Sequence, residues 1–149
     1  MDSSNKRRPA VSILLVEDDE IDVEALGRAV RQAGIKSPLH NACDGVEALA
    51  MLRGTGNHEK LAQPCLILLD INVPRMSGVH FLRELRGDEA LKRSVVFILT
   101  TSGRGSDRLL AYEHNVAGYF LKENLKLLVA ILHAYCQGNE FPDSEISGK

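Results

Sequence analysis

The 149-residue chain has no tryptophan, few other aromatic residues and only three cysteines. Cys43, Cys65 and Cys136 are odd in number, lie far apart and form no C-x-x-C pair, which favours reduced, mostly buried thiols over a redox role. No apolar run approaches the roughly 20 residues that span a bilayer, and none follows the basic start in the form of a signal peptide. We therefore expect an intracellular, cytoplasmic protein with no membrane partner.

The chain also lacks a large excess of either charge. It has 18 lysines and arginines and 20 aspartates and glutamates, which gives a net charge of -2. A general nucleic-acid binder normally carries a basic face, so we expect no nucleic-acid partner. Hydrophobic content of 44% with 26% charge is typical of a soluble globular protein. We predict a flexible arm over 1–10, one domain over 11–137 and a disordered tail over 138–149.

Five short β-like runs alternate with helical periodicity, a pattern typical of a parallel sheet with helices on both faces. Near-continuous Val, Ile and Leu content in three of the runs indicates burial on both faces. Right-handed crossovers between them predict a flavodoxin-like (βα)5 fold of the α/β class, a doubly wound five-stranded parallel sheet of order 2-1-3-4-5. The predicted strands are 11–16, 39–43, 65–70, 95–100 and 118–121.

Capping residues predict where the helices begin and end. The first helix is expected to begin near Asp19 and to stop at Gly34. Asp44 followed by Glu47 is a variant of the capping box and predicts the start of the second helix. The N-caps predicted for the remaining three helices are Ser77, Ser106 and Asn124.

Acidic residues stand at the ends of two strands that this sheet order makes neighbours. Glu17 and Asp18 follow the first strand, and Asp70 ends the third. Two like charges 4 Å apart cost about 4 kcal/mol at an effective dielectric constant of 20, so the cluster requires a compensating cation. Oxygen ligands favour Mg²⁺. We predict a magnesium site formed by Asp18, Asp70, the backbone carbonyl of Asn72 and water.

The ends of the last two strands add a hydroxyl and an ammonium group. Thr100 ends the fourth strand and Lys122 follows the fifth. Attack by an Asp70 oxygen on phosphorus would give an acyl phosphate, with Mg²⁺ and Lys122 neutralising charge and Thr100 beside a phosphoryl oxygen. Each feature alone is common, but an acid pair, a lone aspartate, a threonine and a lysine in this order, each at a strand end, specifically predict phosphoryl transfer.

The chain resembles the receiver domains of response regulators in two-component signalling over roughly 11–137. The resemblance rests on Ile13–Asp19 (ILLVEDD), Leu68–Gly78 (LLDINVPRMSG), Thr100 and Gly118–Lys122 (GYFLK). It implies that a sensor histidine kinase is the phosphoryl donor. The roles it implies are phosphoacceptor for Asp70, direct metal ligand for Asp18, water-mediated ligand for Glu17, phosphoryl contacts for Thr100 and Lys122, and switch aromatic for Tyr119.

Some positions depart from the family pattern. Glu123 stands where the family usually has proline, so we expect a trans bond after Lys122 and a differently shaped loop. Thr101 narrows access to Asp70, and Glu17 in place of aspartate lengthens the reach to the metal. The strings at 99–102 and 122–124, with the polar insert before the third strand, resemble the stand-alone receivers that partner phytochrome-type histidine kinases.

The last predicted helix carries two apolar stripes, of which one sheet face is expected to bury only the first. The first stripe is Leu125, Leu128, Val129 and Leu132. The second stripe is Leu127, Ile131 and Tyr135. It predicts a two-fold homodimer through the fourth helix, fifth strand and fifth helix, and the alternative is that these are scattered surface apolar residues.

The resemblance leads us to expect a single-domain response regulator, which would signal through a protein surface to an unknown downstream protein. It is predicted not to be an enzyme beyond Mg²⁺-dependent self-phosphorylation and slow autodephosphorylation. A phosphohydrolase is disfavoured because Asn72 occupies the place of a second acid, and a flavodoxin-type carrier because acids would repel the FMN phosphate. A pseudo-receiver scaffold that never accepts phosphate stays open, supported by Thr101 and Glu123.

Overall fold

The computed structural model describes residues 11–71, 73–101 and 113–137. Five strands form one parallel sheet in the order β2-β1-β3-β4-β5, which confirms the predicted flavodoxin-like fold. The predicted arm, the predicted tail and the Ser106 cap lie outside the described residues. The strands are β1 (Ser12–Val16), β2 (Leu39–Ala42), β3 (Cys65–Asp70), β4 (Val95–Thr100) and β5 (Gly118–Leu121).

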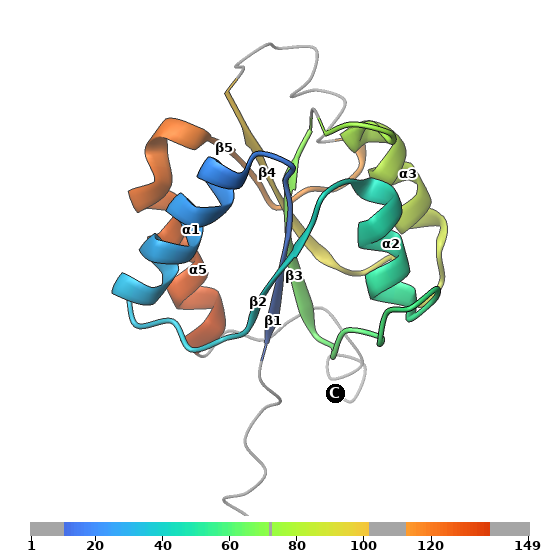
Figure 1. Cartoon of the computed structure of the whole chain (residues 1–149), viewed down its shortest axis with the longest axis horizontal. Helices are drawn as coiled ribbons and strands as arrows, with labels where there is room; N and C mark the ends of the chain where they lie inside the picture. Colours follow the sequence, from blue (N-terminus) through green and yellow to red (C-terminus); the bar gives the residue numbers. More distant parts are fainter. Residues whose placement is uncertain (1–10, 72, 102–112, 138–149) are drawn as a thin grey trace, which may run out of the picture.

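Among the described residues, helices cover both faces of the sheet (Figure 1). α1 (Glu20–Gln32) and α5 (Leu125–Gln137) lie on one side, and α2 (Gly45–Arg53) and α3 (Gly78–Gly87) lie on the other. Every residue of β1, β3 and β4 is buried, as strands that are covered on both faces require. Their near-continuous apolar runs thus build two cores, one on each side of the sheet.

The helix starts follow the predicted caps. Asp19, Asp44 and Ser77 each accept a hydrogen bond from a backbone N–H of the first turn, which leaves fewer unpaired donors at the helix start. The capping box of α2 is shifted by one residue, because Glu47 Oε1 accepts the N–H of Cys43 at 2.8 Å and not that of Asp44. These caps fix the loops that leave the carboxyl ends of the strands.

The start of α5 differs from the prediction. A short 3-10 helix over Lys122–Asn124 leads into α5 at Leu125, so Asn124 lies within a helical turn and is not an extended N-cap. Such a tight turn at a helix end continues the winding without a capping side chain. The Lys122–Glu123 peptide bond is trans, as predicted from the absence of proline.

The second stripe of α5 is only partly exposed. Ile131 and Tyr135 pack against the core on the α1 side, and the Tyr135 ring meets Phe97 edge-on with centroids 5.4 Å apart. The prediction that one sheet face buries only the first stripe is therefore wrong for two members of the second, which are partly buried; for Tyr135 the Phe97 ring extends the apolar surface. Leu127 is the member that stays exposed, at 49% of its surface.

Cysteine burial was predicted correctly for one residue. Cys65 is buried, which raises the pKa of its thiol to about 12, whereas Cys43 is exposed and Cys136 is partly exposed. Cys43 lies at the carboxyl end of β2, beyond the packed core, so the prediction of mostly buried thiols is wrong there. All three cysteines are free. Within the described ranges, no helix combines the length and apolarity that a membrane span needs.

Arg86 on α3 holds together the edge of the sheet at which the strands begin. Its guanidinium donates hydrogen bonds to the carbonyls of Lys92 and Ser94, before β4, and of His114 and Asn115, before β5, at 2.8–3.0 Å. Burial lowers the pKa of this guanidinium. One side chain thus ties α3 to the two segments that enter β4 and β5.

Candidate functional site

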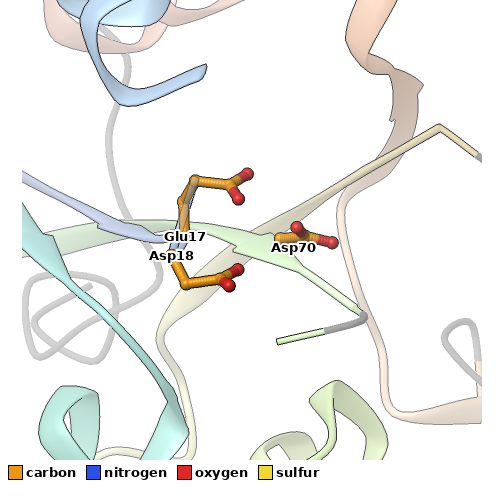
Figure 2. A group of neighbouring side chains, drawn as sticks. All are labelled: Glu17, Asp18 and Asp70. Atoms are coloured by element: carbon orange, nitrogen blue, oxygen red, sulfur yellow. The ribbon is translucent and has the colours of Figure 1, made fainter. Parts of the chain in front are cut away.

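Three carboxylates gather at the carboxyl ends of β1 and β3. Glu17 and Asp18 follow β1, and the parallel pairing of β1 with β3 places them beside Asp70. Figure 2 shows the three side chains projecting into one region. Their ligand oxygens all lie within 4.8 Å of one another. The structure thus brings together the three acids at the sheet edge where the sequence predicted them.

Glu17 is almost completely buried, with 2% of its surface exposed. Its Oε2 accepts the N–H of Asp19 at 3.1 Å, while its Oε1 is buried and accepts no backbone N–H from the described residues. Burial raises the pKa of the Glu17 carboxyl, and the nearby charge of Asp70 acts in the same direction, against the opposing effect of Lys122. A buried carboxylate oxygen that no backbone N–H satisfies needs a cation beside it.

Lys122 supplies positive charge at this point. Its Nζ lies 2.7 Å from Glu17 Oε1, 2.8 Å from Asp22 Oδ2 and 3.0 Å from Asp70 Oδ2. Partial burial acts to lower the pKa of the ammonium, but the contacts with these carboxylates outweigh it and raise the pKa above its usual value. Lys122 is therefore charged and compensates part of the acidic cluster.

Sequence reasoning missed Asp22. An acid in the first turn of α1 is an ordinary feature that favours the helix dipole, so its presence alone indicates no site. Its partner Lys122 lies 100 residues further along the chain. A clue was available in the predicted topology, because α1 begins at the sheet edge where β5 ends.

The donor set fits a divalent cation. Glu17, Asp18 and Asp70 offer only hard carboxylate oxygens, which suit Mg²⁺ or Mn²⁺ better than zinc. Glu17 and Asp70 are buried, and Asp18 is exposed to solvent from which an ion can enter. The predicted ligand at Asn72 lies outside the described residues.

Thr100 and Tyr119 lie on neighbouring strands beside the acids. Thr100 ends β4, which pairs with β3 so that Leu99 is opposite Asp70, and it is fully buried. Tyr119 on β5 pairs with Ile98 and is partly buried against the core on the α2 and α3 side. Thr100 thus lies at the edge that carries the acids, and Tyr119 lies on the neighbouring strand two residues before its end.

The loop between β3 and α3 depends on the absence of a side chain at Gly78. A Cβ there would lie 2.6 Å from Ile71 Cα and 2.9 Å from its carbonyl oxygen, which accepts the Gly78 N–H at 3.0 Å.

We expect Gly78→Ala to destabilise the fold by about 2–4 kcal/mol, because the neighbouring backbone would have to shift to make room for the added methyl group. Urea unfolding would measure this effect. Gly87→Ala is the matched control, since a Cβ at Gly87 meets no atom within 4 Å; an equal loss in both variants would contradict the steric account.

An ion pair joins the same loop to the cap of α2. Arg75 Nε donates to Asp44 Oδ2 at 2.7 Å, and its Nη2 donates to Oδ1 at 3.1 Å. Arg75 has φ 67°, a left-handed conformation that is costly for a side-chain-bearing residue. The hydrogen bond from Arg75 lowers the pKa of Asp44 despite the opposing effect of burial. This pair therefore holds the loop to the start of α2.

The Arg75 pair predicts a pH dependence. The pKa of Asp44 is lower in the folded protein than in the unfolded chain. The ion pair therefore stabilises the fold fully above the unfolded pKa of about 3.9, and this stabilisation is lost as the pH falls through the folded pKa. We expect Arg75→Gln to be less stable than the wild type at pH 7, with a gap that closes below pH ~3.9. Thermal unfolding across pH would measure the gap. The exposed Arg93→Gln is the control, and a gap that is constant with pH would contradict the prediction.

A family model described as "Response regulator receiver domain" matches residues 13–133. Response regulator Rcp1 from Synechocystis sp. is 37% identical over 124 residues, which cover 83% of this chain and 84% of Rcp1. The crystal structure of the Mn²⁺-bound form of Rcp1 superposes with a TM-score of 0.79 at 33% identity, covering 91% of this chain and 100% of that chain.

A second solved structure is the phosphorylated cyanobacterial phytochrome response regulator RcpA, with a TM-score of 0.78 at 31% identity. The match covers 91% of this chain and 100% of that chain. The family model spans most of the chain and includes every element that carries the acidic site. The chain therefore belongs to the response regulator receiver domain family of signalling proteins.

Proposed function

We propose that Asp70 accepts a phosphoryl group from a phosphohistidine of a sensor histidine kinase, and that the modified domain signals to a downstream protein. The observation that carries this proposal is the position of Asp70. Its carboxylate ends a buried strand, belongs to the three-acid cluster and accepts a hydrogen bond from Lys122 Nζ at 3.0 Å. A nucleophilic oxygen thus lies beside groups that can neutralise a transferred phosphoryl group.

The transfer balances as a displacement at phosphorus. An Asp70 carboxylate oxygen forms the new P–O bond, the P–N bond to the donor histidine breaks, and its electron pair stays on the imidazole nitrogen, which takes up a proton. Lys122 is positioned to donate a hydrogen bond to the arriving phosphoryl group, and the Thr100 hydroxyl supplies a second contact. The product is an acyl phosphate on Asp70.

Glu17, Asp18 and Asp70 would hold Mg²⁺, together with the carbonyl of Asn72. When bound, the ion supplies positive charge that offsets the carboxylates and the phosphoryl oxygens. The carboxylate donor set supports this proposal, and so does the solved Mn²⁺-bound form of the relative Rcp1. The chemistry would end with slow hydrolysis of the acyl phosphate, without turnover of a separate substrate.

The donor kinase is proposed to be of the phytochrome type. The support is that RcpA, which this chain matches over most of its length, is a phytochrome response regulator. The output would be a change of surface, because the fully buried Thr100 would move toward the phosphoryl group and leave space for Tyr119. Identical amide spectra of the residues around β4 and β5 with and without beryllofluoride would contradict the switch.

Incubation with radiolabelled acetyl phosphate tests the proposed function. We expect one label per chain in Mg²⁺ and none in EDTA, with the label removed by hydroxylamine as an acyl phosphate is. Borohydride reduction followed by peptide mass spectrometry would map the modification to Asp70. A label at another residue, or no label from either acetyl phosphate or a phosphorylated phytochrome-type kinase, would contradict the proposal and favour a scaffold.

A homodimer through β5, α5 and the fourth predicted helix, the one expected to begin at Ser106, stays a proposal. Its support is the exposed Leu127, since Ile131 and Tyr135 already pack partly against the core. We expect Leu127→Glu to weaken association of the phosphorylated chain at least about tenfold, because a charge would be buried in an apolar contact. Equilibrium sedimentation with and without beryllofluoride would measure this, with the exposed Val46→Glu as control. A wild-type monomer at tens of micromolar in both conditions would exclude the dimer.

A further inference from the structure

The Lys122 ammonium has one partner that does not belong to the acidic cluster. Glu17 and Asp70 are members of the three-carboxylate group, whereas Asp22 is on α1 and is not. Asp22 Oδ2 nevertheless accepts a hydrogen bond from Lys122 Nζ at 2.8 Å, shorter than the 3.0 Å to Asp70. The side chain of Lys122 is 16% exposed and that of Asp22 is 36% exposed, so the contact lies at the rim of the site.

The position of Asp22 allows a capping role, which its contacts do not show. Asp22 stands three residues after the N-cap Asp19, where a capping-box acid would accept the N–H of the N-cap residue. That N–H donates instead to Glu17 Oε2 at 3.1 Å. The Asp22 carboxylate is turned toward Lys122, which is separated from it by 100 residues of chain. Its contact is therefore with the site.

The three partners of Lys122 differ once a cation is bound. A divalent ion on Glu17, Asp18 and Asp70 repels an ammonium that lies 2.7 Å from Glu17 Oε1. Asp22 is outside that group, so the ion does not offset its negative charge to the same extent and Asp22 continues to attract Lys122. An ammonium has three N–H donors, so it can bond to Asp22 and still direct another N–H at Asp70 or at a phosphoryl oxygen there.

We propose that Asp22 is a positioning residue for phosphoryl transfer, which holds the Lys122 ammonium beside Asp70 while a cation occupies the acidic cluster. This role rests on the proposed function of Asp70. Asp22, in the first turn of α1, would act through Lys122 and would not itself touch the phosphoryl group. Because the contact to Asp70 coexists with that to Asp22, the acid orients the ammonium without withdrawing it.

A double-mutant cycle of Asp22→Asn and Lys122→Met tests the proposal. We expect Asp22→Asn to slow labelling by acetyl phosphate at saturating Mg²⁺ about tenfold, the effect of losing one charge-assisted hydrogen bond that orients a reacting group. In the Lys122→Met background the same change should alter the rate less than about twofold, since no ammonium remains to be oriented. Glu24→Gln on the same helix controls for the loss of one negative charge and should label at the wild-type rate.

Urea unfolding in EDTA gives a readout that does not depend on phosphorylation. The two substitutions should be coupled there as well, because the ion pair exists without metal. A labelled wild type with an equally fast Asp22→Asn variant would overturn this role alone. Equal slowing in both backgrounds would also overturn it, by showing a general charge effect. An unlabelled wild type would overturn the proposed function and this role together.

Discussion

The Asp70→Asn variant is expected to incorporate no label from acetyl phosphate, a decrease of at least about 100-fold. The amide has nearly the same size but lacks the anionic oxygen that attacks phosphorus. Lys122 would retain Glu17 and Asp22 as partners, so the site would keep its arrangement. Removing one of three clustered negative charges also relieves repulsion, so we expect no loss of stability.

The measurement is the initial rate of label incorporation at saturating Mg²⁺, beside urea unfolding of the same samples. Glu89→Gln is the matched control, because its side chain is 88% exposed and its partner Lys92 lies before β4, away from the acids. Undiminished labelling of the Asp70→Asn variant would show that another residue accepts the phosphoryl group. Loss of label together with loss of folding would leave a stability defect as the cause.

The second large effect is expected for Lys122→Met, which keeps most of the aliphatic stem and deletes the ammonium. Phosphorylation should slow about 100-fold or more, as when one electrostatic donor to a developing charge is removed. In EDTA the variant should also lose about 2 kcal/mol of stability, because buried Glu17 is left without its ion-pair partner and the rim of the site is solvated. Mg²⁺ should restore much of that stability.

Urea unfolding in EDTA and in Mg²⁺ would separate the two effects of Lys122. Lys126→Met, at an exposed position on α5, is the control and should match the wild type in both media. A variant whose stability loss is the same with and without Mg²⁺ would contradict charge compensation. A wild-type rate of labelling would exclude a role for Lys122 in the transfer.

Much of this fold could be predicted because strong local signals agree with the topology. Uninterrupted apolar runs fixed the limits of β3 and β4, and Asp44 and Ser77 fixed the starts of α2 and α3. The three acids could be placed together because parallel strands end at one edge. In each case residues close in sequence determine the result, and the sheet order follows from handedness.

The features that sequence did not predict depend on contacts between distant segments. The pairing of Asp22 with Lys122 needs the relative position of α1 and the end of β5. The burial of Tyr135 depends on the ring of Phe97 on another element, which no helical period can show. The entry into α5 through a 3-10 turn, where Asn124 was expected to cap, reflects a loop geometry that cap preference alone does not determine.

The four carbonyl contacts of Arg86 have a consequence for how a signal could move through β4. Its guanidinium holds Ser94, immediately before the strand, while Thr100 ends the strand at the acidic edge. A strand of six residues is about 20 Å long, so a shift of ~1 Å at Thr100 corresponds to a tilt of only about 3° around a pivot near Ser94. The strand would then tilt as a rigid unit about its start, at the opposite edge of the sheet from the acidic site.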